Sequence, residues 1–194
     1  MYRTVLTLAW FVGTIYATIP WFWLIVHPFA ERLRARRSRY HIIIPAWFCM
    51  MALVYFITWP WREAVLYHAP ATWLAAVFLF ATAIFIYHRS HLVMGRSELV
   101  PGQERRLVTG GIRQKIRHPI WLAHLCMLLA WTVGSGEVVL YGLTVFALLT
   151  GWPMVRQEEA DLERHFGDEY RTYKRAVPAA FMPRIFRLAK ARKL

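Results

Sequence analysis

Two short segments of the chain hold most of the residues that could do chemistry, and the first is residues 107–119. The Gly-Gly pair at 110–111 permits a backbone turn that other residues resist. Pro119 suits the first position of a helix, where its missing N–H costs nothing. Arg117 and His118 are therefore expected just before a helix N-terminus, where exposed N–H groups favour a carboxylate or hydroxyl ligand. In the alternative interpretation, Pro119 only begins a membrane helix and these two side chains extend to lipid headgroups.

The second segment, residues 156–173, places acidic side chains where a membrane helix should end. We expect residues 156–165 to continue the last apolar helix, so that Glu158 and Glu159 lie about one turn beyond its apolar part. Gly167 is a predicted C-cap. The alternative is a solvated amphipathic tail whose acids pair with its arginines. Acidic residues beside a membrane are unusual, which weakens that alternative.

A further short helix is expected directly after this stretch. Asp168 suits its first turn. Tyr170 and Tyr173 are three residues apart and share one face. The helix should stop before Pro178, because the residue before a proline disfavours helical geometry.

Apolar segments dominate the rest of the chain. Hydrophobic residues make up 58% of the sequence and the mean hydropathy is +0.33, above the usage of soluble domains. A bilayer core needs about 20 apolar residues in a helix. The sequence thus predicts an all-α polytopic membrane protein of about five transmembrane helices, with a C-terminal helical hairpin and a cytoplasmic amphipathic tail. The expected spans are residues 4–26, 42–59, 71–87, 119–133 and 138–155.

The fourth span is short for a full crossing. We expect it to form a tight hairpin with the fifth span, turning at residues 134–136, whose Gly-Ser-Gly sequence favours a turn. Such a hairpin returns Arg156 to the membrane surface from which Pro119 departs. The two chemical segments are therefore predicted to meet at one surface.

The chain has a net charge of +13. The number and positions of its basic residues indicate which partners it binds and how it is oriented in the membrane. Of the 24 Lys and Arg residues, 22 lie in three stretches, residues 31–40, 88–117 and 156–194. By the positive-inside rule these stretches are cytoplasmic and the N-terminus is outside. We expect an integral protein of a bacterial or archaeal inner or plasma membrane. Anionic membrane lipids, and not nucleic acid, are the expected partners of the basic residues.

The two cysteines, Cys49 and Cys126, lie inside apolar runs. Neither belongs to a spacing such as Cys-x-x-Cys, so we expect small core residues and no metal site.

Taken together, the two chemical segments resemble the isoprenylcysteine carboxyl methyltransferase family, to which the phospholipid N-methyltransferases are related. The likeness covers about residues 98–183, and its patterns occur in the same order around a helical hairpin. The matching residues are Leu107-Val108-Thr109-Gly110-Gly111-Ile112, Arg117-His118-Pro119, Glu158-Glu159, Phe166-Gly167-Asp168-Glu169-Tyr170-Arg171-Thr172-Tyr173 and Val177-Pro178.

The resemblance implies a methyltransferase that binds S-adenosyl-L-methionine on the cytoplasmic side. The family usually has Tyr where this chain has Arg113 and Trp121; Trp121 preserves an aromatic ring, whereas Arg113 does not. The expected single domain then has two parts, residues 1–88 with three N-terminal transmembrane helices and residues 89–194 with the cofactor-binding loop, hairpin and tail. The cofactor-binding residues implied are Glu98, Leu107, Val108, Gly111, Arg113, His118, Pro119, Trp121 and Glu158.

The implied chemistry assigns catalytic roles to Arg156 and Glu159. Because the methyl group arrives on a sulfonium, a carboxylate acceptor needs no general base, and the protein has only to align the reactants and exclude water. Arg156 is expected to hold an anionic acceptor, or alternatively to anchor a headgroup. An amine acceptor would need a base such as Glu159 or His118. We expect O-methylation of a carboxylate on a lipophilic small molecule or lipid that enters from the membrane.

Three other functions stay open at this point. One is a phospholipid N-methyltransferase, which would methylate phosphatidylethanolamine. Another is an NADPH-dependent membrane reductase, because sterol reductases of related architecture end in a similar Arg-His-Pro and a Tyr-rich tail. The third is a non-enzymatic membrane scaffold, for which Glu158 and His118 would be dispensable. The pair Glu158-Glu159 favours the methyltransferase over the reductase.

Overall fold

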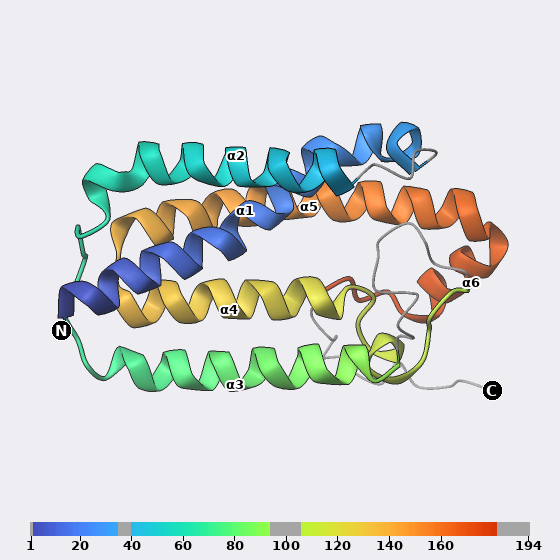
Figure 1. Ribbon diagram of the computed structural model, residues 1–194. Helices are drawn as coiled ribbons and strands as arrows, with labels where there is room; N and C mark the ends of the chain where they lie inside the picture. The colour runs from blue at the N-terminus through green and yellow to red at the C-terminus, as the bar shows by residue number, and fades with distance from the viewer. Residues whose placement is uncertain (1, 35–39, 94–105, 182–194) are drawn as a thin grey trace.

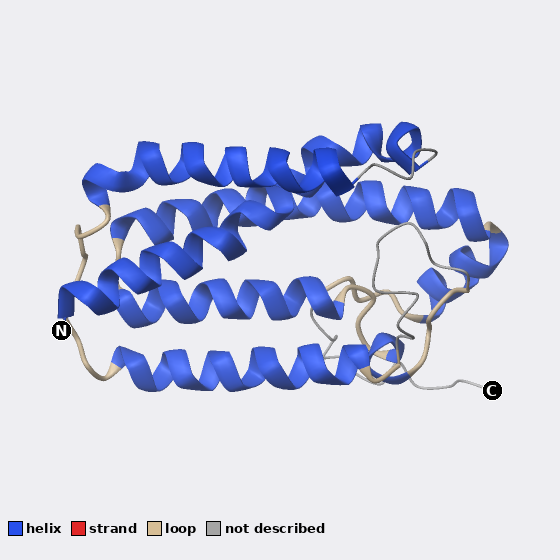
Figure 2. Ribbon diagram, in the orientation of Figure 1, coloured by secondary structure: helices blue, strands red, loops and turns tan. Residues whose placement is uncertain are grey.

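The computed structural model describes residues 2–34, 40–93 and 106–181, without the side chains of residues 26–41. Within these ranges the chain is helical and contains no strand, which confirms the all-α prediction there (Figures 1 and 2). The helices are α1 (Tyr2–Arg34), α2 (Tyr40–Thr58), α3 (Thr72–His91), α4 (Pro119–Ser135), α5 (Val138–Phe166) and α6 (Asp168–Ala176), with short 3-10 turns η1 (Trp59–Trp61) and η3 (Gly111–Gln114).

Four of the described helices are long and apolar enough to cross a membrane: α1, α2, α3 and α5. The helix α4 has 17 residues, a length of about 25 Å, and is shorter than a typical crossing of about 30 Å. It nevertheless lies lengthwise in the bundle, packed against α1, α3 and α5 (Figure 1).

The long helices run alternately in opposite directions, so each end of the bundle gathers distant parts of the chain (Figure 1). One end holds the N-terminus, the connection between α2 and α3, and the turn between α4 and α5. The other end holds the start of α4, the C-terminal part of α5, η3 and α6. We call this second end the α6 end. It is where both chemical segments lie, as the hairpin prediction requires.

Small residues on α1 bring that helix close to α5. Ala9 and Ala17 are fully buried and belong to the same core cluster as Leu140 of α5. A Cβ atom added at Gly13, between them, would lie 2.6 Å from Cδ2 of Leu140. Close approach over small side chains is the usual way in which membrane helices associate.

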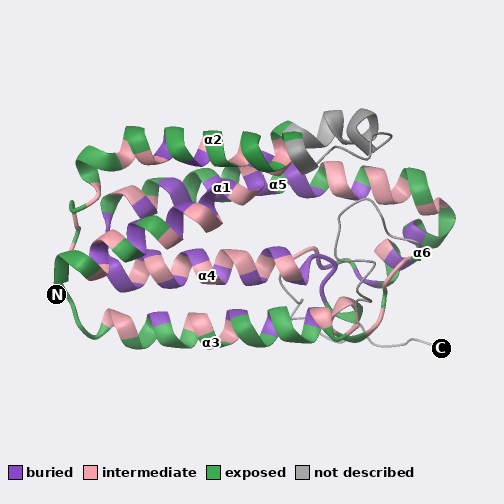
Figure 3. Cartoon of the chain, viewed as in Figure 1, coloured by how far each residue is buried: buried purple, intermediate pink, exposed green. Residues whose placement is uncertain are grey.

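The outer faces of the bundle are apolar. The exposed fractions of Phe56 on α2 and of Leu74 and Phe78 on α3 are 81%, 76% and 72%. Figure 3 shows long exposed faces on α2 and α3, whereas α4 is mostly buried or half-buried. An apolar exterior of this extent is unusual on a water-soluble monomer, and it suits helices of membrane-crossing length.

Several predicted boundaries are corrected. The helix α1 continues to Arg34, into the basic stretch that was expected to be a loop, and α3 continues to His91. Hydropathy marks where apolar side chains end, but the backbone hydrogen bonds of a helix continue beyond that point. Cys126 is buried as expected, but Cys49 is exposed, because α2 is a peripheral helix with most of its surface facing outward.

The turn between α4 and α5 is tighter than the predicted 134–136. The helix α4 ends at Ser135, and Gly136, with φ of +71°, caps it in the left-handed region that favours glycine. The connection between α2 and α3 folds over this turn. The amide of Leu66 donates to the carbonyl of Gly136 at 2.8 Å, and the amide of Val138 donates to the carbonyl of Ala64 at 2.9 Å.

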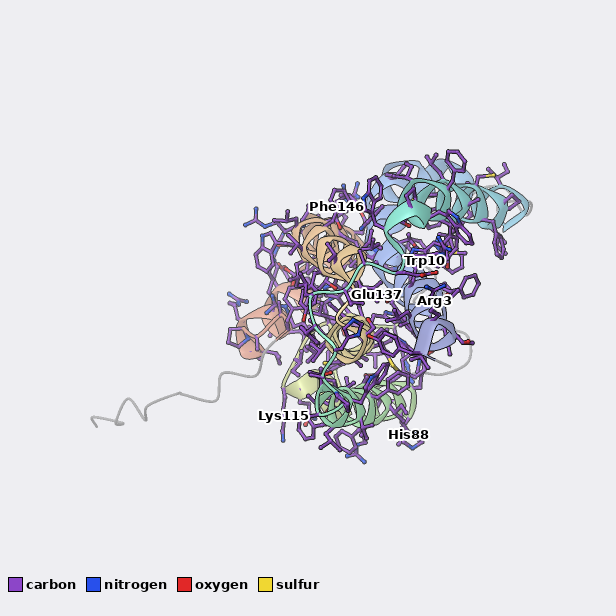
Figure 4. All side chains as sticks on the ribbon, turned by 90° about the vertical axis from the view of Figure 1, so that its left-hand side faces the viewer. Arg3, Trp10, His88, Lys115, Glu137 and Phe146 are labelled. Carbon is purple, nitrogen blue, oxygen red and sulfur yellow. The ribbon has the colours of Figure 1, made fainter. Side chains whose placement is uncertain are left out.

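This cover buries Glu137 completely. Viewed along the bundle from this end, Glu137 lies near the middle, whereas Phe146 and His88 lie toward the outside (Figure 4). Neither carboxyl oxygen of Glu137 has a hydrogen-bond partner among the described residues. Burial raises the pKa of Glu137 to about 8. The carboxyl group is therefore largely protonated at neutral pH.

Candidate functional site

The site is built on the N-terminus of α4. Pro119 occupies the first helical turn and His118 is the N-cap residue, as predicted. The chain after α6 returns to this point: the amides of Arg117 and His118 donate to the carbonyls of Ala179 and Ala180, each at 3.0 Å. These two hydrogen bonds fix the backbone that carries the two polar side chains.

His118 joins the two chemical segments. Its Nε2 lies 3.1 Å from Oε1 of Glu159, and its Nδ1 lies 3.3 Å from Oε2 of Glu158. The side chain of His118 is only 4% exposed. We expected the start of α4 to meet the polar part of α5. The direct contacts of His118 with Glu158 and Glu159 confirm this expectation.

Glu159 is the centre of a buried ionic cluster. Its Oε1 accepts a hydrogen bond from Nε of Arg117 at 2.8 Å and lies 2.7 Å from Nη2 of the same side chain. Its Oε2 lies 2.9 Å from Nζ of Lys174 on α6. The remaining terminal nitrogen of Arg117 donates to the carbonyl of Val177 at 2.6 Å. Glu159 thus connects α4, α5 and α6.

The opposite charges in this cluster keep the buried groups ionised. Burial alone would lower the pKa of His118, but the carboxylates of Glu158 and Glu159 outweigh it and raise the pKa to about 9. Burial alone would raise the pKa of Glu159, but hydrogen bonds from His118, Lys174 and Arg117 lower it to about 2. At neutral pH His118 is therefore an imidazolium and Glu159 a carboxylate.

Glu158 differs from its neighbour Glu159 in its exposure. Its side chain is 37% exposed, against 10% for Glu159. An ionised carboxylate can accept hydrogen bonds at about four lone-pair positions. Glu158 therefore has the capacity to bind a ligand while it holds His118.

Two tyrosines of α6 lie beside this ionic cluster. Tyr170 is 1% exposed, and Tyr173 is 9% exposed and donates a hydrogen bond to the carbonyl of Arg113 at 2.8 Å. The predicted shared face of these residues is confirmed, because both belong to one core cluster with Val177. Leu107, from the first chemical segment, packs against that cluster.

Other residues of the first segment lie around the same end. Val108 is half-buried, and Gly111 begins η3 with φ of +59°, a conformation that favours glycine. A Cβ atom added there would lie 3.1 Å from Cγ1 of Val93. Arg113 directs Nη1 to the carbonyl of Arg117 at 3.4 Å. Glu98 lies outside the described residues, so its expected contact stays a prediction.

Trp121 points into the helix packing. A Cβ atom added at Gly151 of α5 would lie 2.2 Å from Cζ2 of Trp121, so the indole occupies the space that the glycine leaves. Met154 and Val155 complete the buried cluster around it. Trp121 thus packs α4 against α5. Its expected role in lining the cofactor pocket stays a prediction.

Arg156 lies apart from the buried cluster. It is exposed, and its guanidinium lies 5.2 Å from the ring centroid of Trp152. The ring of Phe181 lies 5.9 Å from that of Trp152 and 6.2 Å from that of His118. A short row of aromatic rings therefore connects the exposed Arg156 with the buried His118.

Comparison with known proteins gives one relative, from Haemophilus influenzae (strain ATCC 51907 / DSM 11121 / KW20 / Rd). The two sequences are 41% identical over 59 residues, which is 30% of this chain and 94% of the relative. The chain belongs to the same family as that protein. The relative is described as an uncharacterized protein, so the comparison gives no activity for this chain. No protein-family model and no solved structure matches the chain.

The partners of Glu159 were not predicted from the sequence. Arg117 belonged to a recognised motif but had no assigned contact, and Lys174 had no role. The signal for Lys174 was its position four residues after Tyr170, on a helix predicted to follow the acidic pair. The return of residues 179–181 to the start of α4 had no local signal.

Proposed function

We propose that the chain is an integral membrane methyltransferase that uses S-adenosyl-L-methionine and methylates a carboxylate on a lipophilic acceptor. The contact of His118 with both Glu158 and Glu159 carries this proposal. It joins the two segments that resemble the isoprenylcysteine carboxyl methyltransferase family, and it does so at one end of a bundle with an apolar exterior.

The residues around this contact fit an adenosyl cofactor. The partly exposed carboxylate of Glu158 can accept hydrogen bonds from hydroxyl or ammonium groups. Leu107 and Val108 are half-buried apolar residues of the first segment, and Leu107 packs against the cluster of Tyr170 and Tyr173. S-adenosyl-L-methionine supplies a methyl group on a positively charged sulfonium. We assign cofactor binding to Glu158, Leu107 and Val108, with His118 holding Glu158 in position.

The protonation of the cluster favours an acceptor that is already anionic. His118 as an imidazolium has no lone pair with which to take a proton from an amine. Glu159 is neutralised by Arg117 and Lys174, and its low pKa makes it a weak base. We therefore revise the catalytic role expected for Glu159 to a positioning role. A carboxylate acceptor needs neither group as a base.

Arg156 is the residue we assign to the acceptor. It is exposed above Trp152, on the row of aromatic rings that leads through Phe181 to His118. A guanidinium binds a carboxylate through two parallel hydrogen bonds. A lipophilic acid could keep its tail against the apolar surface of α5 while Arg156 receives its head.

The proposed arrangement places α1 to α5 across the membrane, with α4 as the short fifth crossing. The described basic residues Arg113, Arg117, Arg156 and Lys174 belong to the elements of the α6 end, whereas Arg3 and Arg62 lie toward the opposite end. By the positive-inside rule this end is cytoplasmic and the N-terminus is outside. The cofactor would then arrive from the cytoplasm and the acceptor from the bilayer.

Calorimetric titration with S-adenosylhomocysteine in detergent tests the proposal. Wild type should bind, and Glu158→Gln should bind at least about tenfold more weakly, because a charged acceptor is lost. Glu163→Gln is the matched control, since Glu163 pairs with Arg171 on the exposed side of the tail. Absence of binding by wild type would overturn the proposal, and binding of NADPH in its place would indicate the reductase.

A further inference from the structure

The hydroxyl of Tyr170 is a buried polar group that no described residue satisfies. The side chain is 1% exposed and is the largest fully buried side chain among the residues that the structure describes. Its oxygen neither donates nor accepts a hydrogen bond within the described part of the chain. Buried hydroxyl groups in native proteins nearly always have a partner, so an orphaned one points to a ligand or a bound water.

The surroundings of Tyr170 are the segments assigned to the cofactor. Its ring belongs to a cluster against which Leu107, Leu162 and Phe166 pack. On its polar side it lies close enough to Glu159, Arg117 and Glu158 for their charges to act on it; burial first, and then Glu159, raise the pKa of its hydroxyl. Tyr170 therefore lies near Leu107 of the first segment and near the charged side chains of Arg117, Glu158 and Glu159.

Tyr173 provides an internal comparison. It lies one turn further along α6, in the same cluster, with its ring 6.0 Å from that of Tyr170. The hydroxyl of Tyr173 donates to the carbonyl of Arg113 at 2.8 Å. One tyrosine of this pair is thus engaged by the protein, whereas the buried hydroxyl of the other has no partner among the described residues.

We propose that the hydroxyl of Tyr170 hydrogen-bonds the adenosyl cofactor, which makes Tyr170 a cofactor-binding residue. This inference rests on the proposed function. A phenolic hydroxyl both donates and accepts, so it suits a ligand that carries ring nitrogens and ribose hydroxyls. The aromatic ring is held by apolar contacts on α5 and α6, so the hydroxyl is positioned before the ligand arrives.

The substitution Tyr170→Phe removes only this hydroxyl, and Tyr173→Phe is its matched control. Both variants are titrated calorimetrically with S-adenosylhomocysteine in the absence of any acceptor, and their thermal unfolding is measured without ligand. Tyr170→Phe should weaken binding about 5- to 10-fold, the effect of one neutral hydrogen bond. Its melting temperature without ligand should be unchanged or higher, because the lost group had no partner.

Tyr173→Phe should show the opposite pattern, with a lower melting temperature and an affinity within about twofold of wild type. Unchanged affinity in Tyr170→Phe overturns the inference. So does a melting temperature lowered as much as in Tyr173→Phe, since the hydroxyl would then have a partner within the protein. If wild type itself fails to bind, the proposed function falls and this inference with it.

Discussion

Arg117 and Glu159 lie 42 residues apart and form a buried ion pair in which two guanidinium nitrogens converge on Oε1 at 2.8 and 2.7 Å. The pair closes the hairpin of α4 and α5 at the α6 end. Because the same oxygen also contacts His118, and the other oxygen contacts Lys174, the position of the whole site depends on this one carboxylate.

Removing Arg117 should be strongly destabilising. Arg117→Ala would leave Glu159 buried with less charge compensation, and breaking a buried pair in this way costs about 3–5 kcal/mol. The double variant Arg117→Met with Glu159→Leu should lose less than either single change. Equilibrium unfolding in detergent micelles measures the free energies of Arg117→Ala, of the two single variants Arg117→Met and Glu159→Leu, and of the double variant. Additive losses, or a loss under about 1 kcal/mol for Arg117→Ala, would contradict the buried pair.

Stability should depend on pH through Glu137. Its pKa is raised by burial from the ordinary value of 4.5 to about 8, so the folded state holds a proton that the unfolded state releases. Stability therefore falls as pH rises from 4.5 to 8 and then levels off. Glu137→Gln keeps the neutral shape and should remove this slope. The melting temperature at pH 5 and pH 8 measures it, and an equal slope in the variant would show that another group is responsible.

His118 should contribute stability that disappears at alkaline pH. Its pKa is raised from 6.5 to about 9, so the contribution is complete below 6.5 and is lost as pH rises through 9. The comparison is made in the Glu137→Gln background, which removes the other titration. The difference in melting temperature between His118 and His118→Asn proteins should shrink between pH 6.5 and 9. A constant difference would mean that His118 is neutral in the folded protein.

The contact between Trp121 and Gly151 predicts a position-specific effect of alanine on α5. Gly151→Ala would place a methyl group 2.2 Å from the indole and should separate α4 from α5, with a loss of about 1–3 kcal/mol. The control is Gly142→Ala on the same helix, where an added Cβ meets nothing within 4 Å. That change should be neutral or stabilising, since alanine is the better helix former. Unfolding free energies that are equal for the two variants would contradict the packing.

Local signals predicted much of the α6 end. Pro119 does begin α4, Gly167 does end α5, and the last described helix does run from Asp168 and stop before Pro178. These boundaries follow from the geometry of single residues and their neighbours, which the sequence states directly.

Contacts between distant segments could not be predicted in the same way. The direction of Trp121 depends on a glycine 30 positions later on another helix, and the partners of Glu159 come from α4 and α6. No local pattern indicates that Glu137 is buried, because its burial results from the connection between α2 and α3 folding over it.

Methyl transfer in a bilayer tests the central proposal most directly. The purified protein is reconstituted in vesicles that contain a lipophilic carboxylic acid and phosphatidylethanolamine, and S-adenosyl-L-methionine with a labelled methyl group is added. The account predicts label in the lipid phase that is released by mild alkali, as a methyl ester requires, and little label with Glu158→Gln. No transfer, or alkali-stable label in phosphatidylethanolamine, would contradict it.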